Sequence, residues 1–203
     1  DRTLTGTTIN TVSTLAGGSN ALTITGNADV DGAISSVTNL SVSGTSDLGA
    51  NVTTTGTQTY TGAVTISGAH RTLAGTTINN VSTLNGGGFN LTITGIADVD
   101  GAITNVANLS VSGASNLGAD ITTSGTQTYT GAVTLSGGAR TLTGTTINTV
   151  LTLAGGSNAL TITGNADIDG AITGVTNLSV SLTSDLGANV TTSGTQTYAG
   201  AVT

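Results

Sequence analysis

The sequence has no Cys, Pro, Met or Trp, and among charged residue types it lacks Lys and Glu. Without Cys there can be no disulfide bond and no thiolate metal site. The helix formers Glu, Lys, Arg, Gln and Met are scarce or missing, whereas the strand-favouring Thr, Val and Ile are abundant. These absences exclude helix as the main element and predict an all-β protein.

Charge is also scarce. Only 6% of the residues are charged, and ten Asp against three Arg give a net charge of −7. Arg2, Arg71 and Arg140 lie a full repeat apart, so they form no basic surface, and we predict no nucleic-acid partner. No apolar run approaches the ~18 residues needed to span a bilayer, and no signal-peptide pattern begins at Asp1. We therefore predict no membrane insertion.

Internal repetition dominates what is present. Arg-Thr-Leu at 2–4 recurs at 71–73 and 140–142, which defines a 69-residue repeat. The chain is a single array with units at 2–70, 71–139 and 140–203, the last one shortened. Because neither end has a distinct capping sequence, we expect a piece of a longer array or a subunit whose ends stack.

A shorter rhythm runs inside each unit. Tetrads of polar, apolar, polar and Gly residues end at Gly26, Gly44 and Gly62, and so recur with an 18-residue step. Apolar residues recur at steps of two and six, which indicates short strands separated by turns. Three such strands predict a triangular coil of about 18 residues and hence a parallel β-solenoid. In the first unit the residues expected to face inward are Leu22, Ile24, Ala28, Val30, Ile34, Leu40, Val42, Leu48, Val52, Tyr60, Val64 and Ile66.

The rhythm breaks once in each unit, at 15–20, where Gly-Gly-Ser-Asn predicts a longer loop at one corner. One unit makes somewhat under four coils, and two arrangements stay open. One has four coils with a tight coil near 67–73, and the other has a non-integral number that rotates each unit relative to the last. At about 4.8 Å per coil, some eleven coils would form a rod roughly 50 Å long.

The Gly-punctuated strands, such as those at 22–34 and 58–68, resemble the β-helical repeat regions of large bacterial exoproteins. Filamentous haemagglutinin and autotransporter passengers are examples. The resemblance covers the whole chain through compositional motifs. It implies a right-handed parallel β-helix, an extracellular or cell-surface location, and a role in adhesion or filament formation. Near-identical units and very low charge depart from those proteins and favour a regular fibre.

An Asn-x-Asp-x-Asp-Gly motif has the spacing that opens a calcium-binding loop. The 18-residue step brings Asp47 beside Asp29, and two such carboxylates repel unless water or a cation separates them. No Glu is present to close such a loop, and Ile96 interrupts the series. We expect solvated carboxylates, with weak calcium binding as the alternative. The candidate ligands are Asn27, Asp29, Asp31, Asp98, Asp100, Asn165, Asp167 and Asp169.

Outward Thr and Ser pairs predict a hydroxyl ladder that rises through 3/5, 23/25, 41/43 and 59/61 and continues from 92/94 onward. Regular Thr arrays on β-solenoids resemble ice-binding surfaces, and flat hydroxyl faces also suit lateral packing in fibres. The simplest explanation is that Thr is a good exposed strand residue whose neighbours pair in ladders. The sequence leaves all three interpretations open.

The remaining polar and aromatic positions have structural interpretations. Tyr60, Tyr129 and Tyr198 fall in an apolar row, so we expect them inside the coil with the hydroxyl bonded; carbohydrate stacking would need them exposed. The three Arg are expected at a corner beside an Asp or a carbonyl group. His70 has Ala139 at its equivalent position, so it belongs to no repeated site.

Catalysis is disfavoured by these residues. A nucleophilic triad needs a base and His70 is the only His, while a metal hydrolase needs a His, Cys or Glu cluster. We predict no enzyme and no cofactor, with a polysaccharide-active β-helix as the enzymatic alternative. The favoured function is a structural module of an extracellular bacterial filament that self-associates. Alternatives are an adhesin stalk that presents a separate domain, an ice-binding Thr array, and binding of a surface or carbohydrate ligand.

Overall fold

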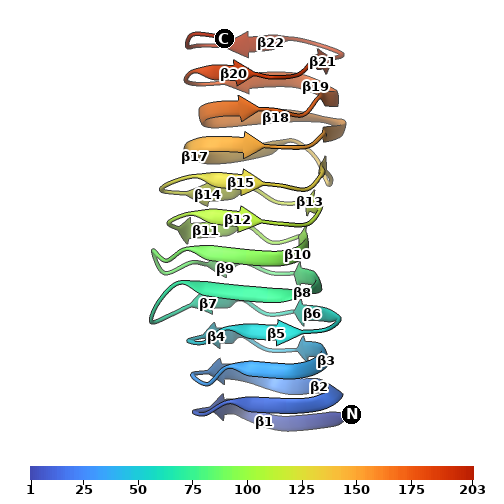
Figure 1. The fold of residues 1–203 in the computed structure, drawn as a ribbon, viewed down its shortest axis with the longest axis vertical. Helices are drawn as coiled ribbons and strands as arrows, with labels where there is room; N and C mark the ends of the chain where they lie inside the picture. Colours follow the sequence, from blue (N-terminus) through green and yellow to red (C-terminus); the bar gives the residue numbers. More distant parts are fainter.

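The computed structural model describes residues 1–203 as one stack of parallel coils (Figure 1). All 22 strands join a single parallel sheet, which confirms the predicted β-solenoid. In Figure 1 the nearer strands, such as β12, run to the right and the fainter strands behind them, such as β11, run to the left while the chain climbs. The winding is therefore right-handed. No helix of the length and apolarity needed to cross a membrane occurs in the structure.

The strands differ in length because some continue round a corner without interruption. They are β1 (Arg2–Thr11), β2 (Leu15–Val30), β3 (Ile34–Val42), β4 (Ser46–Leu48), β5 (Val52–Thr54), β6 (Thr57–Tyr60), β7 (Val64–Ile66), β8 (Arg71–Asn80), β9 (Leu84–Asn85), β10 (Leu91–Val99), β11 (Ile103–Val106), β12 (Leu109–Val111), β13 (Ser115–Leu117), β14 (Ile121–Thr123), β15 (Gln127–Tyr129), β16 (Val133–Leu135), β17 (Arg140–Thr149), β18 (Leu153–Ile168), β19 (Ile172–Val180), β20 (Ser184–Leu186), β21 (Val190–Thr192) and β22 (Gln196–Tyr198).

Three flat faces run along the rod, and each is a column of register partners. Face I contains the column of Leu22, Leu40 and Gln58. Face II contains Ala28, Ser46 and Val64, and face III contains Ile34, Val52 and Leu73. The chain passes from face I to II to III in every coil, so three corners separate the faces.

Side chains alternate between solvent and one narrow interior. In β4, Ser46 and Leu48 are buried while Asp47 between them is exposed. The interior is a single cluster of 40 buried apolar residues, and it includes all of the inward positions predicted for the first unit. Because each coil adds a few buried side chains and one set of inter-coil hydrogen bonds, stability accumulates coil by coil.

One repeat unit does not contain a whole number of coils. The register links Leu22 upward to Leu40, Gln58, Ile78 and Ala97 in turn, so Ala97 lies four coils above Leu22. The residue equivalent to Leu22 in the second unit is Leu91, which comes six residues before Ala97. Six residues make one face of the triangle, and the repeat therefore falls one face short of four coils.

Equivalent residues consequently occupy a different face in each unit. Ile24 lies on face I, and its equivalent Ile93 pairs with Leu73 on face III. Ile162, the third equivalent, pairs with Leu142 in the column of face II. The non-integral arrangement is thus the correct one of the two. A unit spans three and two-thirds coils, and three units complete eleven coils before a position returns to its original face.

Extra corner residues make the average coil longer than the predicted 18-residue step. The coils are about 19 residues apart and the chain makes about 10 turns, one fewer than predicted. The longer corner at 15–20 is confirmed by a register shift between Ala16 and Asn20. There Asn20 Nδ2 donates to the carbonyl oxygens of Gly17 and Gly18, at 3.3 and 3.0 Å, and Ser19 has a φ of +60°.

Glycines stack at the corners for a steric reason. Gly26 has a φ of +127°, and a Cβ there would overlap the carbonyl oxygen of Gly6 in the coil below. The N–H of Gly44 donates to the carbonyl oxygen of Gly26 at 2.9 Å. The corners are therefore places where backbone packs directly on backbone, which explains the Gly at the end of each tetrad.

Candidate functional sites on the rod surface

An outward column of polar side chains crosses four coils of the first unit. Asn10, Asp29, Asp47 and Thr65 are successive register partners on face II. The Nδ2 of Asn10 donates to Oδ2 of Asp29 at 3.0 Å. Partial burial, together with the charges of Asp31 and Asp47, raises the pKa of Asp29. The column thus places like charges on adjacent rungs.

The third unit repeats this column on face III. Asp167 pairs with Asp185 and accepts a hydrogen bond from Asn148 Nδ2 at 2.8 Å. Partial burial, then the charges of Asp169 and Asp185, raise the pKa of Asp167, and the bond from Asn148 opposes them. In each pair one carboxyl group, that of Asp29 or Asp167, therefore keeps its proton to a higher pH than an isolated Asp does.

The second unit changes the column on face I. Asn116 stands where the other units have Asp47 and Asp185, and its Nδ2 donates to Oδ1 of Asp98 at 2.9 Å. The amide replaces a repelling carboxylate by a hydrogen-bond donor. Asp98 is the one carboxylate in this pair, and it accepts the hydrogen bond from Asn116.

The predicted calcium ligands do not converge. The Oδ1 of Asn27 accepts the N–H of Thr45 at 2.9 Å, and Oδ1 of Asn165 accepts the N–H and hydroxyl of Thr183 at 3.2 and 2.7 Å. Both oxygens therefore hold the corner of the next coil. No group of three or more His, Cys, Asp or Glu side chains is close enough to hold a metal ion. Weak calcium binding stays a prediction.

The hydroxyl ladder exists, but it is not one continuous surface. Thr3, Thr23, Ser41 and Thr59 are successive partners on face I, and Asn79 ends the run. The second run, Thr72, Thr92, Ser110 and Thr128, lies on face III, and the third, Thr141, Thr161, Ser179 and Thr197, lies on face II. The prediction that the ladder of the first unit continues into the second is wrong, because each unit is turned by one face relative to the unit before it. Each face carries four-rung segments instead.

The tyrosines lie inside the coil, as predicted, except at the last full coil. Tyr60 and Tyr129 are 1% and 0% exposed, and burial raises their pKa above the ordinary value. Their hydroxyls donate to Oε1 of Gln58 and Gln127 at 2.9 and 2.8 Å. Carbohydrate stacking on these two rings is therefore excluded. Tyr198 is partly buried.

Each buried Gln links one coil to the next through hydrogen bonds that the sequence did not predict. We call this Gln–Tyr pair with its backbone bonds the clasp. Gln58 Nε2 donates to the carbonyl oxygens of Val52, at 3.1 Å, and Ala74, at 2.8 Å in the next coil. Gln127 makes the same bonds to Ile121 and Thr143. A Gln two residues before a Tyr in an apolar row was the available signal, because a polar side chain there needs internal partners.

The side chains of Arg71 and Arg140 bind carbonyl groups at corners, as predicted. Arg71 donates to the carbonyl oxygens of Leu48, His70 and Ser67 at 3.1, 3.0 and 2.7 Å. Arg140 donates to Ser136 O at 2.9 Å and lies 3.8 Å from Asp120. These guanidinium groups satisfy turn carbonyls and form no basic patch.

His70 is the last residue of unit 1, and it contacts a corner of unit 2. Its Nδ1 accepts the N–H of Asn90 at 2.9 Å, and its ring meets the ring of Phe89 edge to face at 6.1 Å. Asn20 and Asn158 stand where Phe89 does in the other units. The pair packs one coil corner on the next.

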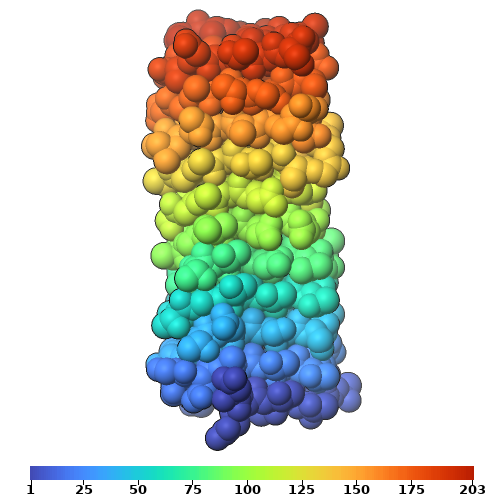
Figure 2. Space-filling model, turned by 90° about the vertical axis from the view of Figure 1, so that its right-hand side faces the viewer, coloured from blue at the N-terminus to red at the C-terminus, as the bar shows by residue number.

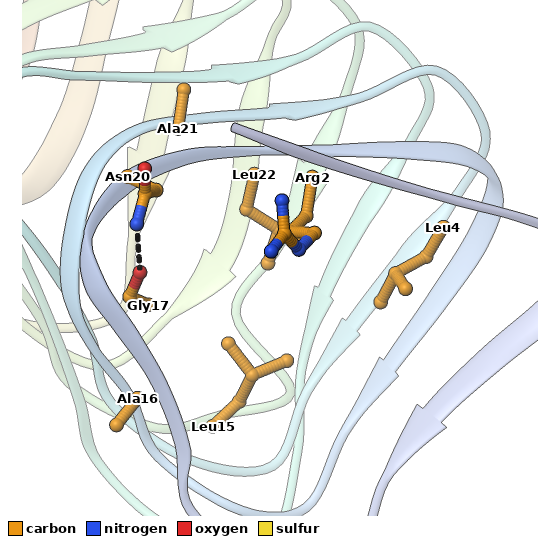
Figure 3. Close-up of a pocket in the computed structure, with 8 residues that line it drawn as sticks. All are labelled: Arg2, Leu4, Leu15, Ala16, Gly17, Asn20, Ala21 and Leu22. Atoms are coloured by element: carbon orange, nitrogen blue, oxygen red, sulfur yellow. Dashed lines mark hydrogen bonds between the residues drawn. The ribbon is translucent and has the colours of Figure 1, made fainter.

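The side surface carries no deep cleft. Figure 2 shows a rod of nearly constant width on its displayed face. A hollow of about 290 Å³ opens at the first coil, where Leu4, Leu15 and Leu22 line it beside Arg2 (Figure 3). This hollow is part of the solenoid interior, which is exposed to solvent at that coil. Two shallow hollows, of about 490 and 270 Å³, are lined mainly by Thr, Ser and Gly and contain no charged side chain.

Comparison with protein-family models, with curated proteins and with solved structures gave no match. The parallel β-solenoid is consistent with a β-helical region.

Proposed function

We propose that this chain is a structural module of a secreted or cell-surface bacterial filament, built by stacking β-solenoid coils. The observation that carries the proposal is the rotation of each unit by one face. Because the unit is three and two-thirds coils long, every surface feature appears on face I, then face III, then face II. The three faces of such a rod therefore carry similar surface features, which suits a fibre that is exposed on every side.

The internal chemistry supports the same function. Gln58 and Gln127 clasp successive coils, glycines stack at the corners, and asparagine side chains such as Asn39 and Asn177 accept backbone N–H groups of the next coil at 2.8 Å. These contacts join neighbouring coils only, so the rod lengthens as units are added without any change of design. The resemblance to bacterial exoproteins supports a surface or secreted location.

The test is a series of arrays with two, three and six units, imaged by electron microscopy and measured by small-angle scattering. Each added unit should lengthen the particle by about 18 Å at constant width, since a coil rises about 4.8 Å. Longer arrays should also join end to end, because coil edges expose unpaired strand groups. Particles that stay monomeric and do not lengthen with unit number would rule out the proposal.

A further inference from the structure

Polar residues are replaced by apolar ones at several positions where the units differ. Ile96 stands where units 1 and 3 have Asn27 and Asn165, and Ala114 stands where they have Thr45 and Thr183. Leu151 in unit 3 replaces Ser13 and Ser82. Ile96 and Ala114 are one 18-residue step apart within unit 2, whereas their sequence spacing to Leu151 in unit 3 suggests no relation.

Ile96 and Ala114 stack at the corner between faces III and I, and the rotation of the units brings Leu151 of unit 3 to the same corner. The N–H of Ala97 donates to Ala114 O and that of Ser115 to Ala132 O, at 2.9 and 2.8 Å, so Ile96, Ala114 and Ala132 rise in successive coils. In the coil above, the N–H of Val133 donates to Thr152 O, so Thr152 lies over Ala132 and ends this column. Val150 and Leu151 directly precede Thr152 and lie beside the column. We call Ile96, Ala114, Ala132, Val150 and Leu151 the apolar corner.

The apolar corner is open to solvent. Ile96 is 43% exposed, Val150 38% and Leu151 53%, and both Ala side chains are exposed. Thr77 is the register partner of Ile96 in the coil below, and Asp169 lies in the coil above Leu151. The apolar corner is thus a short apolar stretch, with Thr77 below it and Thr152 and Asp169 at its upper end. Polar residues at the rim of an apolar patch are typical of a contact surface.

The replacement at Ile96 removes a structural bond. Asn27 and Asn165 accept the N–H of the next coil at 2.9 and 3.2 Å, whereas Ile96 has no acceptor to offer the N–H of Ala114. The second unit therefore lacks a stabilising bond and exposes an isoleucine in its place. Coil stacking does not explain this exchange, whereas contact with another molecule does.

Charge indicates which molecule covers the strip. Two copies of a chain with a net charge of −7 repel most strongly where their Asp pairs meet. Asn116, two residues from Ala114, removes the second carboxylate from the adjoining column on face I. A basic partner would gain more from the paired carboxylates of units 1 and 3. A second copy of this chain is therefore the occupant that the charges favour.

We propose that two rods associate side by side through the apolar corner. This inference rests on the proposed filament function and deepens it, because it assigns lateral contacts to this corner and not to the hydroxyl ladders. The strip is short compared with a standard interface, so a single contact is weak. Several contacts along a longer array would act together.

The test restores the residues of the other units in one variant, Ile96→Asn with Ala114→Thr and Leu151→Ser. Each new residue already occurs at the same position in another unit, so folding is retained, and circular dichroism verifies it. Sedimentation velocity over a concentration series should show association of the native chain, strengthened by salt. The restored variant should pair side by side about tenfold more weakly or not at all, while any end-to-end joining stays unchanged.

Leu182→Gly is the matched control. Leu182 is 51% exposed, replaces Gly44 and Gly113, and lies at the corner between faces II and III. Its removal should leave association unchanged. Equal association of the restored variant and the native chain, or no association of the native chain at any concentration, overturns the inference. Rods that lengthen with unit number but never pair laterally would leave the filament proposal standing and reject this one.

Discussion

Unit 2 differs from units 1 and 3 at surface positions that include two side-chain contacts between coils. Where the outer units have Asn27 and Asn165 holding the next coil, unit 2 has Ile96; where they pair two carboxylates, unit 2 pairs Asp98 with Asn116. All three units nevertheless form parallel coils of one sheet. Buried positions and corner glycines therefore maintain the solenoid, whereas outward positions are free to change.

The largest effect is expected at a corner glycine. Gly95→Ala would place a Cβ in overlap with Gly75 O at a φ of +128°, so it should lower the free energy of unfolding by about 3 kcal/mol or more. Gly88→Ser is the control, because Gly88 has open space and its equivalents are Ser19 and Ser157 at φ values of 60° and 63°. Chemical denaturation checks both. Equal losses would contradict the role of backbone stacking.

The buried clasp should behave alike in units 1 and 2. Gln58→Ala and Gln127→Ala each leave a Tyr hydroxyl and two carbonyl groups without partners, so each should lower the free energy of unfolding by about 2–4 kcal/mol. Gln196→Ala should cost far less, since Gln196 is exposed. A large difference between the first two variants in denaturation would show that the units do not share one core.

Exchanging the residues at positions 27 and 96 should reverse the difference in stability between these two corners. Ile96→Asn supplies an acceptor for the N–H of Ala114 and should raise the free energy of unfolding by about 0.5–1.5 kcal/mol, and Asn27→Ile should lower it by as much. Thermal melts of both variants measure the exchange. No change in either direction would mean that water serves this N–H equally well.

The smallest effect is expected from charge. Because the pKa of Asp29 is raised, the folded chain binds the proton more tightly than the unfolded chain, so stability falls as pH rises from 3.8 through the raised pKa. Asp47→Asn, which copies Asn116, should therefore stabilise at pH 7 by less than about 1 kcal/mol, because Asp47 is exposed and Asp29 is only partly buried. The gain should disappear below pH 3.8.

Asn116→Asp is the mirror variant for this prediction. It should destabilise the second unit at pH 7 and have no effect in acid, measured by melts across the pH range. A gain from Asp47→Asn that persists in acid would show that the carboxylate pair is not its cause.

Much of the local structure followed from the pattern of residues. Alternation along 22–34 correctly placed Ile24 and Val30 inside and Asp29 outside, and Gly-Gly-Ser-Asn correctly marked the long corner. The clasp was not predicted, because Gln58 meets Ala74 only through coil stacking. The apolar corner was not predicted either, since Ile96 and Leu151 belong to different units and are far apart in the sequence.

The coil itself could be derived from the amino-acid pattern, because six-residue steps and alternation are local features that establish which side chains face inward and where the chain turns. How the units stand on one another could be seen only in the folded chain. The few extra residues at the corners add up over four coils and leave each unit one face short of a full turn. That sum depends on the register of every coil, and it determines which surface residues become neighbours.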